Sequence, residues 1–358
     1  MDHHVHFLAT AAALLSVDVT GAPRLADVVT LLEKASAGGR GAGWVRAWGY
    51  DEALLEEGRH PTRDDLDIAC PGRPLVVHHR TGHVAVLNSL ALREVGEVDH
   101  PDGVLSDRHD ILSRVPRIDP DILAGAARSV SREWAVAGVG AFVDATHTNG
   151  PEELELLARW CHEEVVQQDV TAMISAESAP SLAGYGSHVG AVRVGHVKVM
   201  PATVGPALRL AVQAAHDEGY PVAVHVTEVD VLEEAIEALE GSAAPAGTAD
   251  RIEHNALSLP EQVGRLAATG ARVVVNPSFL LHRRDKYRAQ LSTVEQGWLV
   301  RIRSLVDAGI SVRAGSDSPV TPARPAEIVA AATAHPFAPE ESVDAETAAG
   351  LLWPWDTD

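Results

Sequence analysis

The chain opens with the stretch MDHHVHF, residues 1–7, in which Asp2 is followed by three histidines. One interpretation is a disordered tip or the remnant of a tag, which takes no part in a fold. The other is a first β-strand, because the two-residue period of a strand places His4 and His6 on the same face. An HxH pair also occurs by chance, so the rest of the sequence has to separate these interpretations.

Short apolar runs rich in β-branched residues alternate with amphipathic stretches through most of the chain. This alternation is typical of strands and helices that build a parallel sheet. Eight strands with helices between them predict an α/β fold, a (β/α)8 TIM-like barrel. Besides the opening stretch, the strands are expected at 140–146, 170–176, 195–200, 221–227, 250–255, 271–278 and 310–317.

The stretch at about 20–120 does not follow this alternation and has its own content of Trp, Pro and Gly. It is interpreted as a large insertion between the first and second strands. The sequence therefore predicts a single barrel domain, residues 1–358, that carries an insertion subdomain at about 20–120.

Composition limits the partners of the chain. Fifty acidic residues against 29 basic ones give a net charge of −21, which argues against nucleic acid because phosphate binding needs a basic surface. No apolar run reaches the roughly 20 residues of a membrane span, and no secretory signal is recognised. Two cysteines without CxxC spacing favour a reducing, cytoplasmic location.

Polar side chains stand late in several of the expected strands, at the end where barrel enzymes build their sites. Histidines and a carboxylate that converge there would form a nitrogen and oxygen ligand set for a divalent metal with an open position. Five unrelated buried polar groups are the alternative, and each would need its own hydrogen-bond partners. The five residues are His4, His6, His225, His254 and Asp317, and Lys198 also stands late in an expected strand.

An ordered set of short motifs spans about residues 2–325 and resembles the amidohydrolase superfamily of metal-dependent barrel hydrolases. The resemblance is closest to amidohydrolase family 3, the group of YtcJ-like and N-substituted formamide deformylase-like proteins. The motifs are DHHVH, AWGYDEALLEEGRHPTRDDLD, GHVAVLNSLAL, DGVLSD, GVGAFVDAT, VKVM, VAVHVTE, RIEHN, VVVNPS and AGSDSPV.

Relatives carry a β-sandwich built from both termini, which the sequence predicts to be missing here. A homo-oligomer would then cover the exposed barrel surface.

The resemblance implies a role for each residue of the site. His4, His6, His225 and His254 are the implied imidazole ligands of one or two divalent ions, with zinc the expected metal. Asp317 is the implied ligand and general base, and His254 is placed beside it as a second catalytic group. Lys198 either bridges two ions as a carbamate or is a buried salt-bridge lysine.

Substrate contacts are expected from the insertion. His83 and Asn88 are candidate contacts, although either could be a helix cap or a satisfied surface group. Trp48, together with Tyr50, is expected to form an apolar wall, with ordinary core packing as the alternative. Further candidates are His79, Arg80 and His147.

The predicted reaction is hydrolysis of a C–N bond, in an amide or an N-acyl or N-formyl group of a small molecule, by metal-activated water. Deamination of a cyclic or amidine-like substrate is the alternative within the same chemistry. A non-catalytic metal-binding barrel is the alternative outside it. A metal-independent lyase with Lys198 as a Schiff base would leave the four histidines unexplained.

Overall fold

The computed structural model describes residues 1–38, 43–200 and 205–355. The chain divides into two compact units. The barrel unit comprises Met1–Phe7 and Arg128–Asp358, and the insertion unit comprises Leu8–Ala127. None of the helices within the described ranges is long and apolar enough to cross a membrane. The prediction of one domain with an insertion at about 20–120 stays a prediction.

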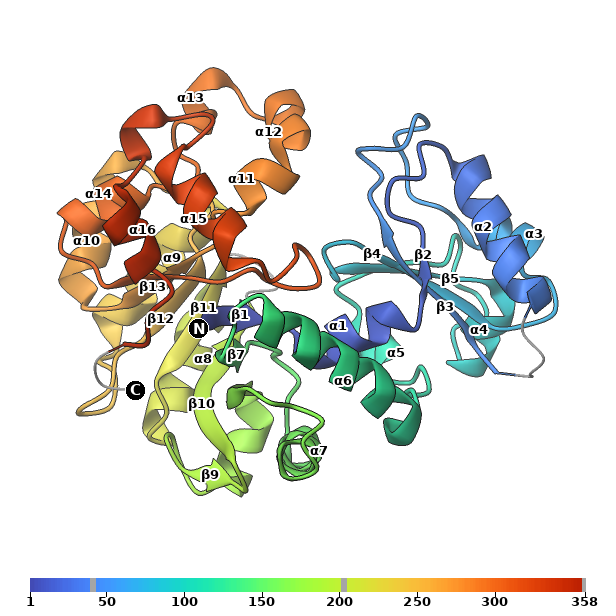
Figure 1. The fold of residues 1–358 in the computed structure, drawn as a ribbon, viewed down its shortest axis with the longest axis horizontal. Helices are drawn as coiled ribbons and strands as arrows, with labels where there is room; N and C mark the ends of the chain where they lie inside the picture. The colour runs from blue at the N-terminus through green and yellow to red at the C-terminus, as the bar shows by residue number, and fades with distance from the viewer. Residues whose placement is uncertain (39–42, 201–204, 356–358) are drawn as a thin grey trace. The chain divides into compact units, whose positions relative to one another are not determined.

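Eight parallel strands form the barrel unit, in the order β1, β7, β8, β10, β11, β12, β13 and β14. Figure 1 labels β1, β7, β10, β11, β12 and β13 of this sheet. Each of the eight expected strands is present, so the predicted TIM-like barrel is confirmed. A short strand, β9 (His188–Val189), adds to β10 in the antiparallel direction. The barrel strands are β1 (Asp2–Val5), β7 (Ala141–Asp144), β8 (Asp169–Ile174), β10 (Val192–Val199), β11 (Val222–Val226), β12 (Arg251–His254), β13 (Arg272–Val275) and β14 (Val312–Ala314).

Helices connect the strands and follow local sequence rules. Five of them, α6, α7, α8, α10 and α15, begin with a proline, whose missing N–H costs nothing at a helix start. Gly270 ends α10 in the left-handed conformation, which glycine adopts without strain. The helices are α6 (Pro120–Val136), α7 (Pro151–His162), α8 (Pro206–Asp217), α9 (Val229–Gly241), α10 (Pro260–Thr269), α11 (Phe279–His282), α12 (Arg284–Gln290), α13 (Thr293–Gln296), α14 (Ile302–Asp307), α15 (Pro325–Thr333) and α16 (Ala345–Gly350), with 3₁₀ turns at η1 (Ala176–Ser181) and η2 (Pro339–Glu341).

The barrel closes where β1 meets the chain that follows β14. The Asp317 amide donates to the His4 carbonyl at 2.7 Å, and the His6 amide donates to the Ser318 carbonyl at 2.8 Å. The buried Asp2 carboxylate reinforces this seam by accepting the Ser316 and His4 amides at 3.0 and 3.2 Å. The seam therefore brings the first strand and the segment after the last one into one hydrogen-bonded structure.

The seam requires a glycine at position 315. A Cβ built there would lie 2.5 Å from the His4 amide nitrogen and 2.6 Å from the His4 Cβ. Both distances are shorter than those that real Cβ atoms show. Neither His4 atom is the far end of a flexible side chain, so neither can move aside easily. Gly315 thus permits the close approach that positions His4.

The insertion unit contains a mixed sheet in the order β2, β3, β4, β5 and β6. Alternate residues of its strands face opposite sides, so Val77 belongs to the core with α2 and α3, and Val76 to the core with α4 and α5. Its elements are α1 (Phe7–Leu14, whose first residue belongs to the barrel unit), β2 (Val17–Asp18), α2 (Leu25–Gly38), β3 (Val45–Tyr50), α3 (Arg63–Ala69), β4 (Leu75–His79), β5 (Val84–Leu87), α4 (Ser89–Glu94), β6 (Val104–Ser106) and α5 (His109–Leu112).

We expect Gly315→Ala to lower the free energy of unfolding by about 1–3 kcal/mol, because the added methyl group forces the seam apart. Denaturant unfolding measures this change. Gly264→Ala is the matched control: Gly264 lies inside α10 with open space around it, so alanine should stabilise the protein by about 0.5–1 kcal/mol. Equal stability of Gly315→Ala and the wild type would contradict the close approach at the seam.

Candidate metal centre

The six residues predicted to form the site lie at or near the carboxyl ends of barrel strands. His4 lies in β1 and His6 directly after it, while His254 is the last residue of β12. Lys198 and His225 are each the next-to-last residue of their strands, β10 and β11, and Asp317 lies three residues beyond β14. Because these strands are parallel, their carboxyl ends meet at one end of the barrel.

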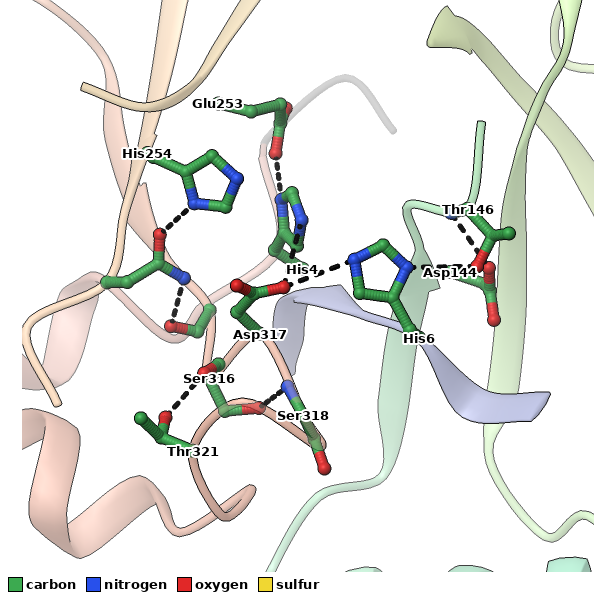
Figure 2. Close-up of polar contacts among 12 residues, drawn as sticks. His4, His6, Asp144, Thr146, Glu253, His254, Ser316, Asp317, Ser318 and Thr321 are labelled. Carbon is green, nitrogen blue, oxygen red and sulfur yellow. Dashed lines mark hydrogen bonds and ion pairs between the residues drawn. The ribbon is translucent and has the colours of Figure 1, made fainter. Parts of the chain in front are cut away.

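His4, His6 and Asp317 converge on a single point (Figure 2). The Asp317 Oδ1 atom lies 3.4 Å from the His4 Nε2 atom and 3.2 Å from the His6 Nε2 atom. Two further histidines adjoin them through ring contacts, with centroid separations of 4.5 Å for His4 to His254 and 4.5 Å for His254 to His225. The structure thus gathers the four predicted histidines and the aspartate in one contiguous group.

The other ring nitrogen of three of these histidines is held by the protein (Figure 2). His4 Nδ1 contacts a Glu253 carboxylate oxygen at 2.5 Å, and His6 Nδ1 contacts the Thr146 hydroxyl at 3.0 Å. The His254 Nδ1 atom contacts the Asn276 side-chain oxygen at 2.7 Å. A carboxylate and an amide oxygen only accept, so the Nδ1 atoms of His4 and His254 donate, which leaves their Nε2 lone pairs for a cation.

Glu253, Asn276 and Thr146 were missed by the sequence reasoning. Asn276 also donates to the Gly315 carbonyl at 2.8 Å, and thereby ties β13 to the seam. A signal existed for Glu253, which is a carboxylate directly before His254 in the expected strand at 250–255. Its partner, however, lies 249 residues away along the chain, which the local pattern does not reveal.

Burial dominates the electrostatics of the site. It lowers the pKa values of His4 and His254 well below the usual range, and the neighbouring Lys198 charge adds to this effect. Burial also lowers the pKa of Lys198 to about 8, against the opposing charges of Glu253 and Asp317. The two histidines are therefore neutral at pH 7, as metal ligands must be.

The Asp317 carboxylate responds differently. Burial alone would raise its pKa, but the interactions with the neighbouring His6 and His4 imidazoles outweigh burial and hold the pKa at about 2. A group with this pKa is ionised throughout the neutral range. Asp317 is thus an anion within a ring of imidazoles.

The donor set fits a divalent cation. His4 Nε2, Asp317 Oδ1 and Lys198 Nζ are buried and have no hydrogen-bond partner, a costly condition that a bound cation removes for the first two. A tetrahedral ion with bonds of about 2.0–2.1 Å separates its ligand atoms by about 3.3 Å. The measured separations of 3.2 and 3.4 Å agree with that geometry.

The backbone is strained at the same place. His254, Asn255 and Asp317 have φ values of 71°, 42° and 59°, in the left-handed region that residues other than glycine seldom adopt. Such strain persists only where surrounding contacts enforce it, and it concentrates at functional sites.

Asp144 has a supporting role at the end of β7. Its carboxylate accepts the Phe7 amide at 2.8 Å, the Thr146 amide at 3.0 Å and the Asn149 side-chain amide at 3.0 Å. Asp144 therefore holds the loop that presents the Thr146 hydroxyl to His6.

Asn88 corrects one sequence expectation. Its side-chain oxygen accepts the Leu75 and Ala91 amides, and its amide group donates to the Cys70 and Arg73 carbonyls. The residue is completely buried and caps the start of α4, so no polar atom remains for a substrate. The helix cap, the alternative interpretation, describes this residue.

His83 and Trp48 also belong to the insertion unit. His83 Nδ1 contacts the Asp107 carboxylate at 2.8 Å on the surface, and the Trp48 ring lies 6.4 Å from the His78 ring. Their roles as substrate contacts stay predictions.

Comparison with known proteins identifies the family. Residues 1–352 match the model described as the amidohydrolase family. The chain belongs to this family. The predicted family is thereby confirmed, and the protein is a hydrolase that acts on carbon–nitrogen bonds.

Two named relatives align with most of the chain. The N-substituted formamide deformylase of Arthrobacter pascens is 24% identical over 423 residues, covering 97% of this chain and 76% of the relative. The amidohydrolase YtcJ of Bacillus subtilis (strain 168), whose assignment is provisional, is 21% identical over 375 residues, covering 91% and 70%.

Two solved structures share the fold. An uncharacterised metal-dependent hydrolase from Pyrococcus horikoshii matches with a TM-score of 0.74 and 21% identity, covering 97% of this chain and 78% of that one. A similarly described protein from Pyrococcus furiosus matches with a TM-score of 0.72 and 23% identity, covering 97% and 79%.

We expect Thr146→Val to weaken divalent-metal binding by about 10- to 100-fold, because His6 loses the partner that orients its ring. Competition with a chromophoric chelator measures the dissociation constant. Thr171→Val, the same exchange on the neighbouring strand β8, is the matched control and should bind like the wild type. An unchanged constant in Thr146→Val would show that this hydroxyl does not orient His6.

Proposed function

We propose that this amidohydrolase uses a divalent metal to hydrolyse the C–N bond of an amide, or of an N-acyl or N-formyl group, in a small molecule. The observation that carries the proposal is the convergence of His4 and His6 on the Oδ1 atom of Asp317 in a buried site. The N-formyl group is included because one relative is an N-substituted formamide deformylase.

His4, His6, His225, His254 and Asp317 would hold the metal. Their nitrogen and oxygen donors, without a thiolate, suit zinc or a similar ion. When bound, such an ion activates water at neutral pH and polarises a carbonyl oxygen. The second ring nitrogen of three of these histidines contacts Glu253, Thr146 or Asn276, and this supports the assignment. Metal-binding histidines ordinarily have their second nitrogen held in this way.

Asp317 would be the general base. Its low pKa keeps the carboxylate ionised at pH 7, so it can accept the proton of the attacking water. Proton return to the leaving nitrogen completes cleavage of the C–N bond. His254, which Asn276 fixes beside His4, would act with Asp317 at the carbonyl of the substrate.

Lys198 would be a carbamate that bridges two ions. Its Nζ atom is buried without a hydrogen-bond partner, and its pKa of about 8 makes the neutral amine accessible. A neutral amine adds to carbon dioxide through its lone pair and releases a proton, and the resulting carbamate is an anion that can bind metal. The alternative is a buried cation facing Glu253 and Asp317.

We expect Asp317→Asn to lower turnover by roughly 10²–10⁴-fold, because the amide keeps the shape of the side chain but accepts no proton. A screen of N-formyl, N-acyl and cyclic amidine compounds with metal-loaded protein supplies the substrate for this comparison. Asp344→Asn, which changes the exposed cap of α16, is the control and should keep full turnover. Equal rates for Asp317→Asn and the wild type would refute the mechanism.

We expect a carbamate at Lys198 whose occupancy rises with pH through about 8, since the neutral amine then becomes the main form. Carbon-13 NMR of protein prepared in labelled bicarbonate should show a carbamate resonance that Lys198→Ala lacks. Lys286→Ala, on the exposed helix α12, is the control and should retain the signal. The absence of the resonance from the metal-loaded wild type would leave Lys198 as a buried cation.

A further inference from the structure

A second group of metal-ligand side chains lies in the insertion unit, and the proposed hydrolysis does not use it. Asp51, Glu52 and His79 each offer one ligand atom, and these atoms all lie within 4.8 Å of one another. Asp51 and Glu52 directly follow β3, and His79 ends β4. These strands are parallel neighbours, and Tyr50 is paired with His79, so their carboxyl ends bring the three side chains together.

The histidine of this group is buried and its inner nitrogen has no hydrogen-bond partner. His79 is 4% exposed, and its Nε2 atom lies 2.9 Å from Glu52 Oε2 and 3.6 Å from Asp51 Oδ1. Despite the short separation, neither His79 Nε2 nor Glu52 Oε2 forms a hydrogen bond. Two buried polar atoms that lie this close without a hydrogen bond indicate that a further group binds both of them.

The opposite side of the His79 ring is arranged as in a metal-binding histidine. Its Nδ1 atom lies 2.7 Å from the Thr81 hydroxyl, an acceptor that can take the Nδ1 proton and leave the Nε2 lone pair free. The Thr81 amide also approaches Nδ1, at 3.2 Å, which would favour the other tautomer. In that tautomer the three side chains form only an ion-pair cluster.

The separations suit a small divalent cation. Tetrahedral coordination at about 2.0–2.1 Å places ligand atoms about 3.3 Å apart, midway between the measured 2.9 and 3.6 Å. The Asp51 oxygens divide their contacts: Oδ1 faces His79 and accepts the Ala53 amide, whereas Oδ2 faces Arg80 at 3.9 Å. Two carboxylates against one guanidinium leave a net negative charge for a cation.

A path from solvent reaches the group. Glu52 and the neighbouring His60 side chains are 28% and 32% exposed, and their nearest oxygen and nitrogen are 3.6 Å apart. The Tyr50 hydroxyl contacts His60 Nδ1 at 3.1 Å and holds this imidazole beside the cluster. Three protein ligands and one accessible side match the pattern of zinc sites that keep an open position.

We infer that Asp51, Glu52 and His79 form a second divalent-cation site, of the zinc type, within the insertion unit. The site takes one ion through one imidazole nitrogen and two carboxylate oxygens. It is independent of the ligands in the barrel.

Zinc content per folded protein tests this inference. The wild type and its variants are stripped with a chelator, dialysed against micromolar Zn²⁺, checked by circular dichroism and measured by elemental analysis. His79→Gln and Glu52→Gln should each contain one equivalent less than the wild type. His83→Gln is the matched control, because His83 also pairs with a carboxylate, Asp107, but belongs to neither group of three ligand side chains found among the described residues, so its zinc content should be unchanged.

Two variants of the cluster, His79→Gln and Glu52→Gln, are compared so that the test does not depend on the folding of one of them. Glu52 is partly exposed, so Glu52→Gln should fold even where a change at the buried His79 does not. Full zinc content in folded Glu52→Gln, or in folded His79→Gln, would overturn the inference and leave an ion-pair cluster. His6→Asn removes a ligand of the barrel site alone. An equivalent of zinc that persists in His6→Asn and is lost in Glu52→Gln therefore belongs to the insertion unit. This result holds whatever the outcome for the proposed hydrolysis.

Discussion

The candidate site depends on the hydrogen bonds that join β1 to the chain after β14. Through the bonds from the Asp317 amide to His4 and from the His6 amide to Ser318, one short seam fixes both HxH imidazoles against the Asp317 carboxylate. Asp2 completes the seam by binding the Ser316 amide, across 314 residues of sequence. The stretch that looks like a histidine-rich tip is thus the strand that closes the barrel.

This arrangement has an energetic cost. Imidazoles, an amine and a carboxylate are removed from water, and His254 and Asp317 adopt left-handed backbone conformations. Hydrogen bonds of these imidazoles with Glu253, Thr146 and Asn276 offset part of this cost by fixing the rings. The remaining unpartnered atoms, His4 Nε2 and Asp317 Oδ1, point to a ligand that the protein itself does not supply.

Much of the barrel could be predicted from the sequence because buried parallel strands are continuous apolar runs. The polar residues that interrupt those runs near their ends marked His225, His254 and Lys198 as candidates. Thr146, Glu253 and Asn276 were not predicted, since their contacts join distant strands. Asn88 was misassigned as a substrate contact, although an Asn directly before SLALRE is also a helix-capping signal.

The insertion was harder to describe from sequence for a physical reason. Its sheet mixes parallel and antiparallel neighbours, and apolar residues alternate between two cores, so no single period runs through it. The compact unit comprises Leu8–Ala127, so its first residue lies within α1. The cluster at Asp51 and His79 likewise depends on the pairing of two strands that the sequence does not specify.

The central claim is that His4, His6 and Asp317 bind one metal ion. Anomalous diffraction from zinc-loaded crystals, measured on both sides of the zinc absorption edge, tests this claim most directly. The account predicts an anomalous peak within bonding distance of His4 Nε2, His6 Nε2 and an Asp317 carboxylate oxygen. Zinc-loaded crystals with no peak among these three atoms would contradict it.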